Sequence, residues 1–404
     1  MNAGPISLKT VVLSACLLIL LSIGFRAGFG LFLHPMSEAR GWGRDVLSLA
    51  LAIQNLAWGV IAVFAGGLAD RFGNLKVLLT GVVCYAVAMW CMAHATTELE
   101  IIATAGVLVG AGIAGTSFGI VLPAMARAVP KERRGQVLGI VTAAGSLGQF
   151  LVVPAMQGLI ELSGWFYALH YLGFAAFFMA LFALPLSSFS GTADNSGPEL
   201  DVSLVEILFR ALRVRSFVLL VIGFFVCGFH VAFITVHMPS FLVDLGLSPR
   251  VGGWSIGMIG FCNIFGAYFS GVESSRRPKQ RILVFIYCGR VVVIGVFLLM
   301  PMTLIGVLVF SALMGFLWLA TVPPTSGLVA VFFGTRYMTF LYGIVFLSHQ
   351  IGGFCGVWMG GWFYETYGNY NGIWIVAMIL GGAAALLHWP IREQDYTVRL
   401  KEAA

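Results

Sequence analysis

The segment Gly66-Gly67-Leu68-Ala69-Asp70-Arg71-Phe72-Gly73-Asn74-Leu75-Lys76 is a short charged stretch between two long apolar runs. Its glycines would allow a tight turn between closely packed helices. Asp70, Arg71 and Lys76 place charges of both signs in that turn. A plain hydrophilic turn that only follows the charge rules of membrane loops would not require this order of residues. The order therefore indicates a defined loop between two membrane helices.

The composition around this loop excludes a soluble globular protein. Of the 404 residues, 59% are hydrophobic and only 10% are charged, whereas a soluble domain carries about 25% charged residues. Backbone polar groups cannot remain unpaired in hydrocarbon, so apolar runs of about 20 residues must be helices. We therefore expect an all-α polytopic membrane protein with twelve transmembrane helices, over residues 10–33, 46–67, 77–94, 100–122, 135–157, 166–186, 215–239, 250–271, 281–301, 303–328, 340–363 and 372–390.

Basic residues decide the expected orientation, because cytoplasmic loops retain Lys and Arg. With the amino terminus inside, only Arg40, Arg44 and Arg250 of the 23 basic residues fall outside, and Arg26 and Arg290 lie within spans. Both termini are then cytoplasmic. The net charge of +6 reports this topology and contact with anionic membrane lipids, and it does not indicate nucleic-acid binding.

The chain divides into two halves that repeat. Residues 187–214 are polar and contain Gly and Pro, which is typical of a linker. One shift of the sequence aligns Glu161 with Glu365, Gly164 with Gly368, and Pro35 with Pro239, and it also aligns Arg26 with His230. We expect a first six-helix bundle over residues 1–186, a cytoplasmic linker over 187–214, and a second bundle with a short cytoplasmic tail over 215–404.

The charged stretch resembles the signature loop of the major facilitator superfamily, Gly-x-Leu-Ala-Asp-Arg-x-Gly-Arg-Lys, and departs from it at the Arg-Lys pair. The resemblance implies two six-helix bundles that move about a substrate bound at mid-membrane. It also implies that the loop holds or releases the opposite half. The gating residues would be Gly67, Asp70, Arg71, Gly73 and Lys76.

A second resemblance concerns Gly24-Phe25-Arg26-Ala27-Gly28 through Met36 and the following Gly41-Trp42-Gly43-Arg44, which are similar to bacterial monocarboxylate porters and oxalate/formate antiporters. The sequence departs from two related groups of transporters. Asn263 and Ala267 stand where the proton-coupled animal monocarboxylate transporters carry Asp and Arg. The Arg and the Gly-Pro pair typical of drug/proton antiporters are also absent, which disfavours drug efflux without excluding it.

Four ionisable residues lie well inside apolar runs. Arg26, Arg290, His230 and His349 are costly there, because a central ion costs at least about 2.5 kcal/mol. All 17 acidic residues lie in loops, in the linker, in the tail or near span ends, so no central carboxylate neutralises Arg26. A guanidinium matches a carboxylate in geometry, which indicates an anionic substrate. The alternatives are a structural Arg26, a structural or snorkelling Arg290, and histidines that only pack.

Neutral polar residues complete the candidate substrate site. Asn55, Asn263 and Gln350 could orient a carboxylate or hydroxyl, although hydrogen bonds between helices would explain them equally well. In the tenth span, Pro323 and Pro324 break the helix, and Thr321 could satisfy freed backbone groups or face the substrate.

These observations predict a monomeric secondary active transporter in the bacterial inner membrane. It would move a small organic anion, and within that class a monocarboxylate, by proton symport or anion exchange. The alternative is efflux of lipophilic drugs or metabolites. An enzyme would need a nucleophile or metal cluster, and the sequence offers no such spacing, so no cofactor is expected.

Overall fold

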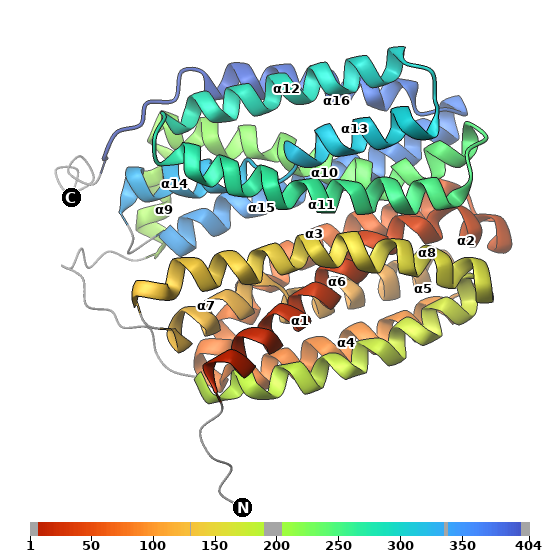
Figure 1. Ribbon diagram of the computed structural model, residues 1–404, viewed down its shortest axis with the longest axis horizontal. Coiled ribbons are helices and arrows are strands. Elements are labelled where there is room, and N and C mark those ends of the chain that lie inside the picture. Colours follow the sequence, from red (N-terminus) through yellow and green to blue (C-terminus); the bar gives the residue numbers. More distant parts are fainter. Residues whose placement is uncertain (1–6, 130, 190–203, 335–337, 397–404) are drawn as a thin grey trace, which may run out of the picture.

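The computed structural model describes residues 7–129, 131–189, 204–334 and 338–396 of the chain. Over these ranges the secondary structure is helical, with no strand. The helices lie roughly side by side along one direction, and those of the first half lie below those of the second half in Figure 1. The predicted all-α class is confirmed.

The elements of the first half follow the apolar runs closely. They are α1 (Leu8–Gly28), η1 (Phe29–Phe32), α2 (Leu33–Arg40), α3 (Arg44–Phe72), α4 (Asn74–His94), α5 (Glu98–Ile101), the π-helical η2 (Ile102–Leu108), α6 (Val109–Thr116), α7 (Phe118–Ala128), α8 (Lys131–Ala183) and η3 (Leu184–Phe189).

The second half begins after residues 190–203, which lie outside the described ranges and cover much of the predicted linker. Its elements are α9 (Leu204–Leu212), α10 (Arg215–Asp244), α11 (Pro249–Ser274), α12 (Lys279–Leu299), α13 (Leu304–Phe316), α14 (Val322–Phe333), α15 (Met338–Tyr367) and α16 (Asn371–His388).

Ten of the described helical segments are long and apolar enough to cross a membrane. One of them, Val137–Leu186, spans 50 residues and turns at Gly164, where φ is 76°, so it supplies two crossings. The shorter apolar helices α13 and α14 together form one more crossing. The total agrees with the twelve transmembrane helices that the sequence predicts.

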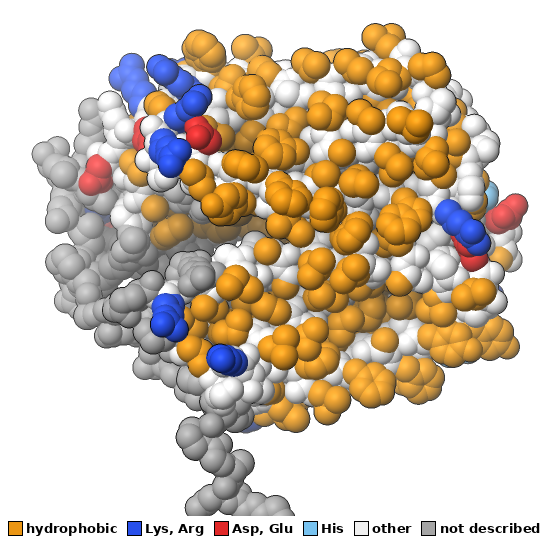
Figure 2. Space-filling view, viewed as in Figure 1, with side chains coloured by type: hydrophobic (Ala, Val, Ile, Leu, Met, Phe, Trp, Pro, Cys, Tyr) orange, Lys and Arg blue, Asp and Glu red, His pale blue; other side chains and the backbone are white. Residues whose placement is uncertain are grey.

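The surface is apolar where a soluble protein would be polar. On the face shown in Figure 2, hydrophobic side chains cover most of the middle, and charged side chains lie toward the two ends. Leu299 is 89% exposed, and Phe285 and Leu162 are exposed as well. Such a surface suits contact with lipid tails.

The two ends of the bundle are named here by the arginine found at each. The Arg44 end comprises the turns near residues 41–43, 95–97, 164, 245–248, 300–303 and 368–370, on the right in Figure 1. The Arg71 end comprises the turns near residues 73, 275–278 and 334 and the start of α1. Successive spans connect at alternate ends, as the predicted topology requires.

The charged stretch is more helical than predicted. Helix α3 continues through the apolar–charged boundary to Phe72, and α4 begins at Asn74. The turn therefore rests on Gly73 alone, whose φ of 90° favours a residue without Cβ. The predicted loop over residues 66–76 is wrong in extent, because Gly66 and Gly67 are accommodated within the helix.

The tenth span breaks before its prolines. Helix α13 ends at Phe316 and α14 starts at Val322, with Pro323 and Pro324 in its first turn. Proline is tolerated there because its missing N–H would have no partner in the helix. The predicted break is present, and it occupies residues 317–321.

Candidate functional site

Arg26 lies near the end of α1 and points toward α3. Its Nη2 donates a hydrogen bond of 2.9 Å to Asn55 Oδ1, and its Cζ lies 4.8 Å from the centre of the Trp58 ring. The Asn55 amide is oriented because its Nδ2 donates to the Leu51 carbonyl oxygen at 2.9 Å. Arg26 is thus held by a neutral acceptor and an aromatic face, both on one side of α3.

Trp58 connects this position to the opposite half. Its Nε1 donates to Ser117 Oγ at 3.1 Å, which fixes the ring. The ring meets Phe346 of α15 edge-on at 5.4 Å between centroids. Phe346 in turn stacks on the His349 ring at 5.7 Å with an angle of 8°. Aromatic side chains from both halves therefore meet beside Arg26.

His349 and Gln350 belong to the same region. His349 Nδ1 lies 3.1 Å from Gln350 Oε1. Gln350 packs against α3 so closely that a Cβ added to Gly59 would lie 2.9 Å from its Cβ and Cγ. Its Nε2 is buried and has no hydrogen-bond partner among the described residues. The structure brings together three predicted site residues, Arg26, Asn55 and Gln350. His349 reaches this group through Phe346, and its ring also packs on Phe224 of α10.

The other predicted residues lie inside the second half. His230 is fully buried and bonds through Nε2 to the Ala377 carbonyl oxygen at 2.7 Å, so the repeat mate of Arg26 faces α16. Arg290 is also fully buried and donates to the carbonyl oxygens of Leu317 and Trp318. These contacts support the structural alternative for both side chains.

Asn263 and Thr321 are also engaged by protein groups. Asn263 Nδ2 donates to Ser146 Oγ at 2.8 Å, and its Oδ1 accepts from the Leu319 backbone N–H at 2.9 Å. Thr321 Oγ1 lies 3.2 Å from Cys227 Sγ. Neither residue contacts the Arg26 group in the described structure, and their role in substrate binding stays a prediction.

The charge of Arg26 has no acidic counterpart here. A guanidinium carries five N–H donors, and the one side-chain hydrogen bond of Arg26 to a described residue goes to an amide. No ion pair among the described residues involves it. Part of its side chain stays accessible, and the groups around it lie between the two halves.

Two helix pairs form most of the contact between the halves, and we name them the α3–α15 seam and the α8–α11 seam; η1 also contacts α10. At the Arg44 end of the α3–α15 seam, Arg44 forms a two-pronged ion pair with Asp244 at 2.5 and 2.6 Å. Its backbone N–H donates to Glu365 Oε1 at 2.6 Å, and Tyr370 Oη lies 3.2 Å from its Nη1. Arg44 is almost fully buried.

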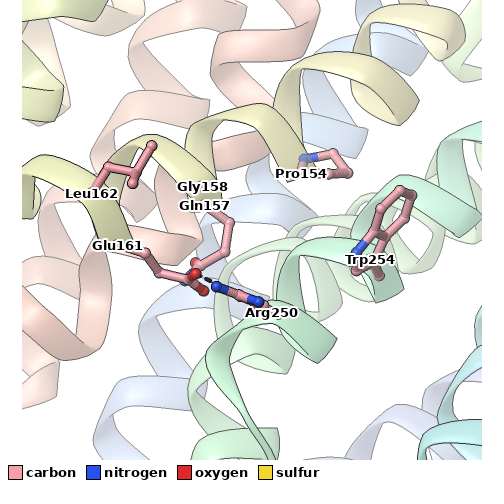
Figure 3. Close-up of a pocket in the computed structure, with 7 residues that line it drawn as sticks. All are labelled: Pro154, Gln157, Gly158, Glu161, Leu162, Arg250 and Trp254. Atoms are coloured by element: carbon pink, nitrogen blue, oxygen red, sulfur yellow. Dashed lines mark hydrogen bonds and ion pairs between the residues drawn. The ribbon is translucent and has the colours of Figure 1, made fainter.

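The α8–α11 seam carries the corresponding contact. Arg250 Nε donates to Glu161 Oε2 at 2.6 Å, and Gln157 donates to the other carboxylate oxygen. This pair lines a cavity of about 380 Å³, where Glu161 and Arg250 face each other across the seam in Figure 3. Arg250 is 74% exposed. Pro154, Gly158, Leu162 and Trp254 complete the lining.

Toward the Arg71 end the halves separate. On α3, Gly59 is in close contact with α15, but a Cβ on Gly66, two turns further on the same face, would meet nothing within 4 Å. The same holds for Gly343 of α15 and Gly139 of α8. The seams are therefore closed from the Arg44 end to mid-bundle and open beyond it.

The predicted gating residues lie at the open end. Gly67, Arg71 and Lys76 are exposed, and Gly73 makes the turn. No ion pair joins Arg71 or Lys76 to a residue whose side chain is described; Arg71 lies 5.3 Å from the ring of Phe72. The side chain of Asp70 lies outside the described ones. The gating role stays a prediction.

Sequence reasoning missed Trp58, Phe346 and Ser117. The chain holds 33 Phe and 10 Trp residues, and nothing in their spacing separates those at the interface of the halves from those facing lipid. The exposed carboxylate pairings of Glu161 and Glu365 across the halves were equally invisible, although the repeat had aligned these two residues.

Two halves of apolar helices with a partly exposed arginine between them suit a membrane transporter. The sequence model of the Major Facilitator Superfamily matches residues 15–357, and the chain belongs to this family of transporters.

Relatives and solved structures agree with this assignment. An uncharacterized MFS-type transporter of Bacillus subtilis, YcxA, is 26% identical over 376 residues, covering 90% of each chain. Monocarboxylate transporter 13 of Rattus norvegicus is 23% identical and covers 94% of this chain and 88% of its own. A bacterial homologue of the human lysosomal transporter Spinster, solved in an inward-facing and unoccupied conformation, has a TM-score of 0.76 at 14% identity, over 94% of this chain and 96% of its own. These comparisons indicate a transporter and not an enzyme.

Proposed function

We propose that the protein is a secondary active transporter of a small organic anion, and that a carboxylate of the substrate binds Arg26. The observation that carries the proposal is the guanidinium of Arg26, which lies between the halves with a single amide partner and no described acidic side chain. A cation at this depth is costly unless a counter-charge is supplied. A substrate carboxylate supplies it with charge-assisted hydrogen bonds.

A monocarboxylate suits the surroundings of Arg26 better than a dicarboxylate. Trp58 and Phe346 offer aromatic surface next to the guanidinium, which suits the apolar body of such a molecule. A second carboxylate would find no second arginine there, because Arg290 is bonded to helix carbonyls inside the second half. The likeness to monocarboxylate transporter 13 supports the same substrate class.

Transport would follow from the arrangement of the seams. We propose that the bundles formed by residues 1–186 and 215–404 rock about the Arg26 group, so that the site opens to one side at a time. The concentration of Lys and Arg at the Arg71 end supports a topology in which this end and both termini are cytoplasmic, in the inner membrane of a bacterium. The described state is then open to the inside, with proton symport or anion exchange as the driving process.

The test is a thermal-shift panel on detergent-purified protein with acetate, lactate, benzoate, succinate and the lipophilic cation tetraphenylphosphonium. A ligand at about 100 times its Kd stabilises by about 2.7 kcal/mol. We expect a monocarboxylate to stabilise the wild type and to lose this effect in Arg26→Gln. Uptake of that monocarboxylate into proteoliposomes should be lost in the same variant.

Arg40→Gln is the matched control. Arg40 also donates one hydrogen bond, to the Ala93 carbonyl oxygen at 2.9 Å, and lies over a tryptophan ring, that of Trp165. Its contacts stay within the first half, so carboxylate binding should survive its replacement. Stabilisation by the lipophilic cation alone, equal in wild type and Arg26→Gln, would refute the proposal and favour efflux of lipophilic compounds.

A further inference from the structure

The break in the tenth span exposes backbone groups inside the bundle, and four of them are matched by side chains: the carbonyl oxygens of Leu317, Trp318 and Ala320 and the N–H of Leu319. Arg290 donates to the carbonyl oxygens of Leu317, at 2.9 and 3.2 Å, and of Trp318. Unpaired backbone groups in a membrane cost several kcal/mol each. Arg290 therefore caps the carboxyl end of α13, where the carbonyl dipoles favour a cation.

Two side chains of helix α11 form hydrogen bonds with further backbone groups of the break. Asn263 Oδ1 accepts from the Leu319 N–H at 2.9 Å, and Ser270 Oγ donates to the Ala320 carbonyl oxygen. The two helices touch between these bonds, since a Cβ on Gly266 would lie 1.8 Å from the Phe316 carbonyl oxygen. The position of α11 and the shape of the break are thus directly linked.

Asn263 has a second partner in the other half of the molecule. Its Nδ2 donates to Ser146 Oγ of α8 at 2.8 Å. The orientation of the amide is fixed, because the Leu319 N–H needs an acceptor and so must face Oδ1. One side chain therefore connects the first half to the backbone of the tenth span in the second half.

This bond lies where the α8–α11 seam ends. From the Arg44 end, α11 contacts α8 at successive turns: Gly253 approaches Gln157, Gly257 approaches Pro154, and Gly260 approaches Gln149. The Asn263–Ser146 bond is the next contact, and two turns beyond it on α8, Gly139 meets nothing within 4 Å. Separation of the two halves along this seam must therefore break the Asn263–Ser146 bond.

We propose that Asn263 is a positioning residue that couples the α8–α11 seam to the break in the tenth span. While the seam is closed, Ser146 holds the amide with Oδ1 on the Leu319 N–H. When the seam opens, the amide loses Ser146, turns more freely, and releases Leu319, so that α14 can move relative to α13. The transport step in this statement rests on the proposed function; the coupling itself does not require a particular substrate.

Hydrogen–deuterium exchange of the peptide that contains residues 317–321, in purified protein without substrate, tests the coupling. Asn263→Ala should accelerate exchange of the Leu319 amide about five- to tenfold, the effect of losing one hydrogen bond. Ser146→Ala, a small change in the opposite half, should accelerate it severalfold as well. The double variant should add little to Asn263→Ala, since both act through one bond.

Ser255→Ala is the matched control. Ser255 also lies on α11 and forms a buried bond of 2.8 Å to Ser311 of α13, but it does not reach the first half. Its loss should leave exchange at Leu319 unchanged. If Asn263→Ala accelerates exchange and Ser146→Ala does not, Asn263 only caps the break locally and the coupling is refuted.

A kinetic measurement separates this proposal from the one on Arg26. Asn263→Ala should keep the thermal shift produced by a monocarboxylate while lowering the maximal rate of its uptake into proteoliposomes by about an order of magnitude. Loss of the thermal shift in Asn263→Ala would mean that the residue binds substrate, which overturns the positioning role. Failure of every carboxylate to bind wild type would refute the function of Arg26 and leave the exchange result at Leu319 standing.

Discussion

The α3–α15 and α8–α11 seams come from equivalent parts of the two repeats, yet they differ in how their charges are buried. Glu365 and Glu161 are repeat mates, and each meets the first residues of the partner helix in the other half. Arg44 is 8% exposed and has Asp244, Glu365 and Tyr370 around it, whereas Arg250 is 74% exposed with Glu161 alone. Equivalent positions of the repeat therefore carry a buried arginine at one seam and an exposed arginine at the other.

This difference in burial determines how much each ion pair contributes to the stability of the closed Arg44 end. A two-pronged pair whose guanidinium is buried contributes more than an exposed pair, because solvent screens it less and several partners lose their contact when the arginine is removed. An exposed pair contributes about 0–1 kcal/mol and is screened by salt. We infer that the contacts of Arg44 with Asp244 at the end of α10 and with Glu365 of α15 provide most of the electrostatic stability of the closed Arg44 end.

Replacing Arg44 should therefore have the largest effect. Arg44→Ala leaves Asp244 unpaired and should destabilise the closed Arg44 end by about 2 kcal/mol or more, which is about thirtyfold in the equilibrium between the two states. Distances between spin labels at Leu162 and Tyr367, exposed at this end on opposite halves, should lengthen. Arg40→Ala is the control, and equal distances in Arg44→Ala and wild type would contradict the inference.

Steric closure of the same seam gives an intermediate effect. A Cβ on Gly361 would lie 2.6 Å from Ser48 Cβ and 3.0 Å from the Asp45 backbone, so Gly361→Ala should cost about 1–2 kcal/mol by overpacking. Gly139→Ala is the matched control at the open end, where the added methyl meets nothing and helix propensity favours alanine. Thermal unfolding midpoints compare them, and equal losses in both would show that the Arg71 end is closed as well.

The smallest effect is expected at the exposed pair. Arg250→Ala should change the stability of the closed state by less than about 1 kcal/mol, and the change should vanish in 1 M salt, where the Debye length falls to about 3 Å. The effect of Arg44→Ala should be less sensitive to salt, because the Arg44 guanidinium is 8% exposed whereas that of Arg250 is 74% exposed. A larger loss of stability in Arg250→Ala that persists in 1 M salt would contradict the inferred difference between the two ion pairs.

Part of the candidate site was predictable because of what a membrane forbids. Arg26 was identifiable from its depth in an apolar run and from the absence of acidic residues in the spans. Asn55, His349 and Gln350 were candidates for the same reason, although hydrogen bonding between helices explained them equally well. Trp58 and Phe346 were not predictable, because an aromatic residue in a membrane helix is equally suited to lipid and to a neighbouring helix.

The roles of Arg290 and Asn263 could not be predicted from residue type and depth in the membrane alone. Both are polar residues in spans, as Arg26 is, and their side chains bond to the broken backbone at Leu317, Trp318 and Leu319. The prolines had marked the break, but which side chains satisfy it depends on which helices pack around it. Sequence separation carries no information on that packing.

The sequence by itself determined the twelve-helix membrane fold, the repeat and the isolated charge of Arg26, because hydrocarbon allows only long apolar helices and makes a buried cation conspicuous. The tertiary structure alone decided which end of the bundle is closed, how deeply Arg44 and Arg250 are buried, and where Asn263 points. These properties depend on distances between helices far apart in the chain, and those distances arise only when the two halves pack together.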